Sequence, residues 1–239
     1  LVNRMIDLKV DAIFTLGSIA GKAAKEVTEK RAPDLPVVFG VISNPVGGGI
    51  VKSMRSSENN ITGITPINEI IVSKRLEIFL EMVPDIKRVV FGWSDPYTSG
   101  IENLRQASAT LGVELADKQV KDVAELRQFF AAFAFREGDG ILRATDAPSG
   151  TLVKEIIALS LKKKIPLSGT NVTDAESGAL MSYGANYHKI GMQAARLMDA
   201  ILRGAKPADL PIELPEGFDF VINAKTAAIF QNTVAFAPD

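Results

Sequence analysis

Short apolar runs alternate with longer amphipathic segments along most of the chain. The runs are rich in Val, Ile and Phe, and the segments between them carry apolar side chains at helical spacing. This alternation is typical of an α/β fold in which helices cover a parallel sheet. The pattern predicts eight strands, at Ala12–Leu16, Val37–Ile42, Arg88–Gly92, Val113–Gln119, Gly140–Leu142, Ile165–Ser168, Ala179–Tyr183 and Phe220–Asn223.

One helix stands out through a continuous apolar stripe before Gly204. The stripe consists of Ile190, Ala194, Leu197, Met198, Ile201 and Leu202. Glycine commonly follows the last turn of a helix, so we expect this helix to end near Gly204 and to pack on a sheet.

Two segments have the character of connections between lobes. Asn59–Pro66 mixes turn residues with β-branched residues and is predicted to be an extended crossover. At Tyr183–Asn186 a strand ends and a helix begins through a glycine. If both segments are crossovers, residues 66–184 form one α/β lobe inserted into another lobe made of the flanking parts.

The start of the chain has the pattern of an incomplete βα unit. Leu1–Leu8 is typical of the last turns of an amphipathic helix, and the strand Ala12–Leu16 follows at once. We therefore expect further residues upstream, including the first βα units of the same lobe.

The composition of the chain argues against several kinds of function. The 239 residues suffice for one large or two smaller α/β domains, and 27 basic against 28 acidic residues leave no net charge to attract nucleic acid or an anionic membrane. The absence of cysteine excludes disulfides and thiolate chemistry, and a single histidine argues against a zinc centre. No apolar run reaches the roughly 18 residues of a membrane span, and no export signal opens the chain.

The segment TLGSIAGKAAKEV is the sharpest local feature. A buried strand leads through Gly17 to Ser18, which is expected to be the N-cap of a helix that starts near Ile19. The free amide groups and the dipole of such a helix suit a carboxylate or phosphate. Ordinary capping of a structural helix is the alternative.

Two further segments follow predicted strands, at the edge where parallel sheets bind ligands. Trp93–Gly100 holds the only Trp, a Tyr and several hydroxyl groups, and is either a ligand contact or a structural turn. Asp146 is either a hydrogen-bond acceptor for an ammonium group or the cap of a helix that begins near Ser149.

Catalytic motifs are missing. His188 lies one turn into a predicted helix among polar neighbours, and no G-x-S-x-G elbow accompanies it. The run Gly47–Ser53 ends in Lys-Ser but lacks the glycine before the lysine that a phosphate-binding loop requires, so we interpret it as a flexible turn.

Three blocks resemble one known family. They are VDAIFTLGSIAGKAAKEVTEKRAPDLPVVFGVISNPVGGGIVKS, NNITGI and GALMSYGANYHKIGMQAARLMDAILRGAKPADLPIELPEGFDFVINAKTAA. They are similar, in this order, to the ABC-transporter substrate-binding proteins that include tryptophan- and tyrosine-binding members. The resemblance implies a type I periplasmic-binding fold, with two lobes, three hinge crossovers and a ligand between the lobes.

The resemblance also implies lobe bounds and hinges. The first lobe, N-terminally incomplete, would comprise residues 1–64 and 186–220, and the second 66–184, with 221–239 as a candidate addition. The expected hinge residues are Thr62, Gly63, Tyr183, Gly184 and Val221. Asn186 is expected to cap the helix that follows the second crossover.

Carried over by position, the family's ligand contacts fall on four segments. Gly17-Ser18-Ile19 resembles the carboxylate-binding turn, and Asn44-Pro45 matches a segment where members often have Asp-Pro. Asn44 is neutral and cannot offer an amino group the charge of an aspartate. Asp146 matches the polar contact of the second lobe. The segment containing Trp93, Tyr97 and Ser99 is more aromatic than usual in the family, and its two rings are expected to pack on an aromatic or apolar part of the ligand.

The function that the resemblance implies is capture of a small carboxylate, an aromatic amino acid or aromatic acid, for an ABC permease in the membrane. Such a protein lies in the periplasm, or outside the membrane on an N-terminal lipoprotein anchor. No cofactor, metal, nucleic acid or enzymatic activity is expected. The effector-binding core of a transcription regulator is the alternative, and an α/β enzyme is the third option.

Overall fold

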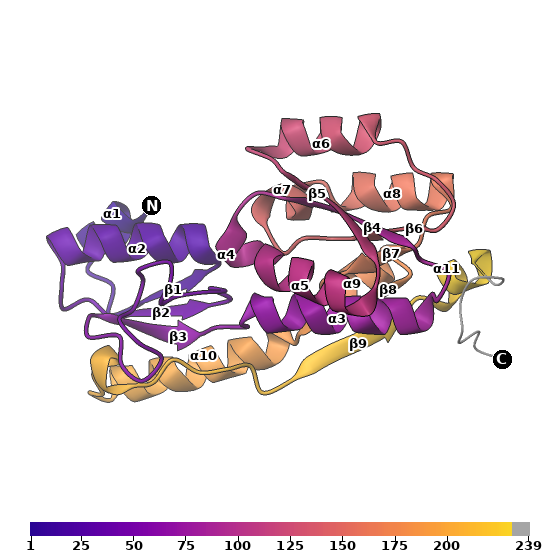
Figure 1. Cartoon of the computed structure of the whole chain (residues 1–239). Coiled ribbons are helices and arrows are strands. Elements are labelled where there is room, and N and C mark those ends of the chain that lie inside the picture. The colour runs from indigo at the N-terminus through magenta and orange to yellow at the C-terminus, as the bar shows by residue number, and fades with distance from the viewer. Residues whose placement is uncertain (231–239) are drawn as a thin grey trace. The chain divides into compact units, whose positions relative to one another are not determined.

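A computed structural model describes residues 1–230, with Tyr97 described through its backbone alone (Figure 1). The chain folds into two compact units. Unit 1 comprises Leu1–Ile67 and Ala185–Gly217, and unit 2 comprises Asn68–Gly184 and the segment that starts at Phe218. Three passages of the chain therefore connect the units.

Unit 1 is a three-stranded sheet between helices. Its elements are α1 (Val2–Asp7), β1 (Ile13–Leu16), α2 (Ser18–Arg31), β2 (Val37–Gly40), β3 (Ile61–Ile64), α10 (Tyr187–Leu202) and the 3₁₀ helix η1 (Pro207–Asp209). The strands are parallel in the order β1-β2-β3, and Val37 of β2 lies beside Ile13 and Ile61.

The two faces of this sheet are covered by different helices. Val37 and Phe39 pack with Ala24 of α2, whereas Val38 packs with Ile190 of α10. Figure 1 shows α2 and α10 on opposite sides of the three strands. The alternation follows from the strand period of two, which sends successive side chains to opposite faces.

Unit 2 is a larger sheet of the same kind. Its elements are α3 (Asn68–Met82), β4 (Arg88–Trp93), α4 (Pro96–Ser99), α5 (Ile101–Leu111), β5 (Glu114–Gln119), α6 (Val123–Ala132), β6 (Asp139–Leu142), α7 (Ala147–Thr151), α8 (Val153–Lys163), β7 (Leu167–Gly169), α9 (Val172–Glu176), β8 (Met181–Ala185), β9 (Phe218–Ile222) and α11 (Ala224–Ile229). The strand order is β5-β4-β6-β7-β8-β9, and β4 to β8 pair in parallel.

Each face of the larger sheet also has its own core. Val89 and Phe91 pack with Leu76 and Phe79 of α3, while Val90 packs with Leu126 of α6 on the other face. In Figure 1, α6 and α8 lie on one side of the strands, and α3 and α5 on the other.

The predicted α/β class, with parallel sheets covered by helices, is confirmed. The main difference concerns Ile61–Ile64, predicted to be a connecting ribbon, which forms the fully buried strand β3 of unit 1. The predicted cap is confirmed at Asn186, whose side chain accepts a hydrogen bond from the amide of Lys189 at 2.8 Å. The helix that it caps ends at Leu202, just before Gly204.

Candidate functional site

In unit 1, the turn after β1 leads directly into α2. Gly17 is the N-cap, with φ 83° and ψ 162°, a conformation that residues with a Cβ avoid. Ser18, expected to be the N-cap, is instead the first helical residue, and no side chain caps the helix. The first amides of a helix lack intrahelical acceptors, and the dipole adds positive charge there. The turn therefore offers donors suited to an anion, beside the 77% exposed side chain of Ile19.

Thr15 lies just before this turn and was missed by the sequence analysis. Its side chain is only 7% exposed, and its hydroxyl has no hydrogen-bond partner among the described residues. The Oγ1 atom lies 3.6 Å from the place where a Cβ on Gly21 would be, so it faces the first turn of α2. Buried hydroxyls are nearly always bonded, so this one is a functional candidate.

The predicted contacts Asn44 and Pro45 lie in the loop after β2. Asn44 Oδ1 accepts a hydrogen bond from the amide of Gly47 at 2.8 Å, and its carbonyl accepts one from Gly48 at 2.9 Å. Pro45 is buried, and its carbonyl accepts the amide of Ile50 at 2.8 Å. These bonds give the glycine run a defined turn at the carboxyl edge of the unit 1 sheet.

In unit 2, Asp146 joins the ends of two neighbouring strands. Its Oδ1 accepts the amide of Ser149 at 2.9 Å, and this bond caps α7, as predicted for one of its two roles. Its Oδ2 accepts both the amide and the hydroxyl of Ser94, at 2.8 and 3.0 Å. Ser94 directly follows β4, and Asp146 lies in the loop after β6. The role in binding an ammonium group stays a prediction.

A buried ion pair lies at the same edge and was not foreseen. Arg143, just after β6, donates through Nε to Asp174 Oδ2 at 2.8 Å, and both side chains are 5% exposed. Asp174 also accepts the amide of Thr170 at 2.7 Å, and the Thr170 hydroxyl accepts from Arg143. The cluster locks the loops after β6 and β7 together.

Trp93 is placed differently from the expectation. Its side chain is 6% exposed and packs in the core with Phe91 and Leu104. The indole Nε1 donates to Asp117 at 2.9 Å, and the same carboxylate raises the pKa of Arg105, mainly through their hydrogen bond. The ligand-facing ring surface expected at Trp93 is therefore not present in this structure.

The other two residues predicted in that segment lie in α4. Ser99 is 1% exposed, and its amide donates to the carbonyl of Asp95 at 3.0 Å, so it belongs to the turn of this short helix. Tyr97 is also in α4, and its side chain lies outside the described part of the structure.

The predicted hinge residues fall at different distances from the three unit boundaries. Tyr183 and Gly184 are the last residues of unit 2 before unit 1 resumes. Thr62 and Gly63 lie inside β3, and that boundary comes later, after Ile67. Val221 lies inside β9, three residues after the boundary at Phe218. The hinge roles themselves stay predictions.

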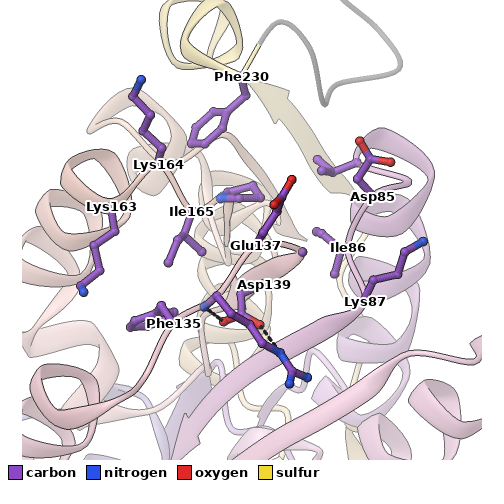
Figure 2. A pocket seen from close by; sticks show the side chains of 14 residues that line it. Asp85, Ile86, Lys87, Phe135, Glu137, Asp139, Lys163, Lys164, Ile165 and Phe230 are labelled. Carbon is purple, nitrogen blue, oxygen red and sulfur yellow. Dashed lines mark hydrogen bonds and ion pairs between the residues drawn. The ribbon is translucent and has the colours of Figure 1, made fainter.

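Unit 2 also has a pocket of about 850 Å³ away from these positions (Figure 2). It lies where β4, β6 and β7 begin. Figure 2 shows Lys164 and Ile165 on one side of the pocket, Ile86 and Lys87 on the other, and Glu137 between the two sides. None of the predicted site residues lines it.

Within residues 1–230, no three His, Asp or Glu side chains are grouped so that they could hold a metal ion. In the same part of the chain, none of the helices combines the length and apolar character needed to cross a membrane.

Comparison with known proteins relates this geometry to a family. Residues 1–234 match the family described as ABC transporter substrate binding protein. The tyrosine-binding protein of Clostridioides difficile (strain R20291) is 22% identical over 233 residues, which cover 95% of this chain and 64% of that protein. The chain thus spans somewhat less than two thirds of the length of this relative.

Two solved structures share the fold. A conserved domain protein from Vibrio cholerae O1 biovar eltor str. N16961 superposes with a TM-score of 0.87 at 24% identity, over 99% of this chain and 78% of the other. An ABC domain from Streptococcus pneumonia, in complex with L-Trp, has a TM-score of 0.85 at 20% identity, over 100% and 78%. Because the family match covers nearly the whole sequence, the chain belongs to the ABC transporter substrate-binding protein family.

Proposed function

We propose that the protein is the extracytoplasmic solute-binding component of an ABC importer and captures a small carboxylate ligand. The observation that carries the proposal is the turn before α2. There, uncapped helix amides follow Thr15, whose buried hydroxyl faces the first turn of α2 and has no partner in the described part of the chain. A carboxylate bound at this turn would accept hydrogen bonds from the amides of Ser18 and Ile19 and from Thr15.

The ligand class that we propose is an aromatic amino acid or aromatic acid. The support comes from two relatives, one named as a tyrosine-binding protein and one solved in complex with L-Trp. In this chain, Asp146 is the candidate partner for a cationic group of the ligand. Asn44 and Pro45 remain candidate contacts, and Tyr97 and Ser99 are candidates in α4.

Capture would proceed by hinge closure. A ligand that contacts both units only in the closed state shifts the population toward that state, and no bond is made or broken. We place the hinges close to the three unit boundaries, at Ile67, Gly184 and Gly217. Ile67 has φ 41°, a conformation uncommon for a β-branched residue, as is often found where the chain changes direction.

The closed form would deliver its ligand to an ABC permease in the membrane. We therefore propose a location in the periplasm, or outside the membrane on an N-terminal lipoprotein anchor. The family match supports transport over the alternative of a regulator's effector-binding core.

The test is calorimetric titration of the purified protein with tyrosine, tryptophan, phenylalanine and the matching aromatic acids. At least one should bind tightly, and Ser18→Pro should weaken its binding. Proline is favoured at the first helical position, so this change removes one amide donor while the helix persists. A hydrogen bond to a charged group is worth about 1.5–3 kcal/mol, which predicts a roughly tenfold or greater loss of affinity.

Ser18→Ala is the matched control, because it removes the hydroxyl and leaves the amide. It should bind nearly as well as the original protein. If no compound of the panel binds, the proposed function is wrong. If Ser18→Pro binds as tightly as Ser18→Ala, the carboxylate does not lie at this turn.

A further inference from the structure

Asp146, at the carboxyl edge of unit 2, carries a negative charge that no cation of the described residues balances. Asp174 is paired with Arg143 at 2.7 Å, so the buried ion pair is neutral as a whole. Asp146 receives hydrogen bonds only from neutral donors, and within residues 1–230 no cationic group lies at ion-pair distance from it. A partly buried carboxylate at a binding edge is stabilised when a ligand brings the missing cation.

The three bonds of Asp146 are distributed unevenly over its two oxygens. Oδ2 accepts two hydrogen bonds, both from Ser94, and Oδ1 accepts one, from the amide of Ser149. A carboxylate has about four acceptor positions, two on each oxygen. The open position is therefore on Oδ1, and Ser94 determines which oxygen remains open.

Ser94 can hold the Asp146 carboxylate in one orientation because of its position at the end of β4. It directly follows β4, which pairs with β6, and Asp146 lies four residues beyond β6. The 2.8 Å bond from its amide and the 3.0 Å bond from its hydroxyl fix one oxygen from two directions. These two hydrogen bonds restrict rotation of the carboxylate before any ligand binds.

We propose that Ser94 is a positioning residue that holds Asp146 so that Oδ1 accepts the ammonium group of the ligand. This inference rests on the proposed function and narrows its ligand class to zwitterionic amino acids. Ser94 does not touch the ligand. It acts through Asp146, so its effect should depend on whether the ligand carries an ammonium group.

The experiment compares tryptophan with indole-3-propionate, phenylalanine with 3-phenylpropionate, and tyrosine with 3-(4-hydroxyphenyl)propionate, by calorimetry at constant pH and salt. These pairs differ in the amino group and share the carboxylate and the ring. The unmodified protein should bind the amino acid at least about tenfold more tightly. Ser94→Ala should reduce that preference several-fold and leave the affinity for the acid nearly unchanged. Ser94→Thr, which retains the hydroxyl, should restore the preference.

A double-mutant cycle separates positioning from a general structural effect. Asp146→Asn should abolish the preference, and adding Ser94→Ala to it should change the preference no further. Unfolding curves of each variant check that the fold is retained.

Each other outcome contradicts a stated claim. If acid and amino acid bind equally to the unmodified protein, or if Ser94→Ala weakens both by the same factor, the inference is wrong while the proposed function stands. If neither member of any pair binds, the proposed function fails and the inference with it.

Discussion

Substitution of Thr15 should stabilise the fold and weaken ligand binding at the same time. Its hydroxyl is buried and, among the described residues, unpaired. An unsatisfied buried polar group costs about 1–3 kcal/mol. Valine has the same shape without the hydroxyl, so Thr15→Val should raise the free energy of unfolding by about 1 kcal/mol. The same change should weaken ligand binding, because it removes one donor to the carboxylate.

Thr28 provides the matched control for this prediction. It is also fully buried, but its hydroxyl donates to the carbonyl of Ala24 at 2.9 Å and accepts from Asn60 at 3.0 Å. Thr28→Val should therefore lower the free energy of unfolding by about 1–2 kcal/mol. Urea denaturation measures both variants, and calorimetry measures their binding. Destabilisation of similar size in the two variants would show that Thr15 is bonded like Thr28.

Trp93 shows what residue patterns in the sequence do and do not reveal about a site. Val89, Phe91 and Trp93 are two positions apart in β4 and share the face that packs on α3 and α5. The period of two therefore indicated a core position, although the place of Trp93 at the strand end suggested a ligand contact. Thr15, and the bond between Ser94 and Asp146, were missed for another reason. Their roles depend on which hydroxyls find partners, and this follows only from the packed structure.

At the scale of elements, β3 depends on the small size of one residue. Gly63 lies beside Phe39 of β2, and a Cβ at this position would collide with the Phe39 carbonyl oxygen. Backbone cannot move aside as a flexible side chain can. Gly63→Ala should therefore lower the free energy of unfolding by about 1–3 kcal/mol, as measured by urea denaturation.

A Gly→Ala substitution in α10 should change the free energy of unfolding in the opposite direction. Gly191 lies within this helix, is exposed, and has open space where a Cβ would be added. Alanine is favoured over glycine in helix interiors by about 0.5–1 kcal/mol, so Gly191→Ala should stabilise the protein by that amount. Both glycines belong to unit 1, so the pair tests local geometry within one folded unit. A neutral result for Gly63→Ala would show that β2 and β3 are farther apart than described.

Most elements could be predicted because each has its own periodic pattern. All eight predicted strands are present within a few residues, since short apolar runs between helical segments leave few alternatives. The strand that was not predicted as part of a sheet is β3. Its four residues include Thr and Gly beside turn-forming asparagines, and only pairing with β2 makes them a strand. Local pattern does not encode such a long-range partner.

At the scale of the whole molecule, the proposed binding groups are divided between the two units. The helix amides after β1 belong to unit 1, and Asp146 belongs to unit 2. Under the proposed function, a zwitterion would gain its full binding free energy only when both groups are engaged. Its differential affinity for the state in which both are engaged is what would drive closure.

Ligand-dependent closure can be tested with paired labels. The sequence has no cysteine, so introduced cysteines are the only labelling sites. Lys30→Cys in α2 and Lys154→Cys in α8 are exposed and place one label on each unit. Saturating tryptophan should shift and narrow the distance distribution between these labels, as measured by electron spin resonance, because binding selects the closed state.

A second pair of labels, Lys30→Cys and Lys206→Cys, lies within unit 1 and should show no change. Binding detected by calorimetry without any shift in the first pair would contradict hinge closure, and an equal shift in both pairs would indicate rearrangement inside unit 1 instead.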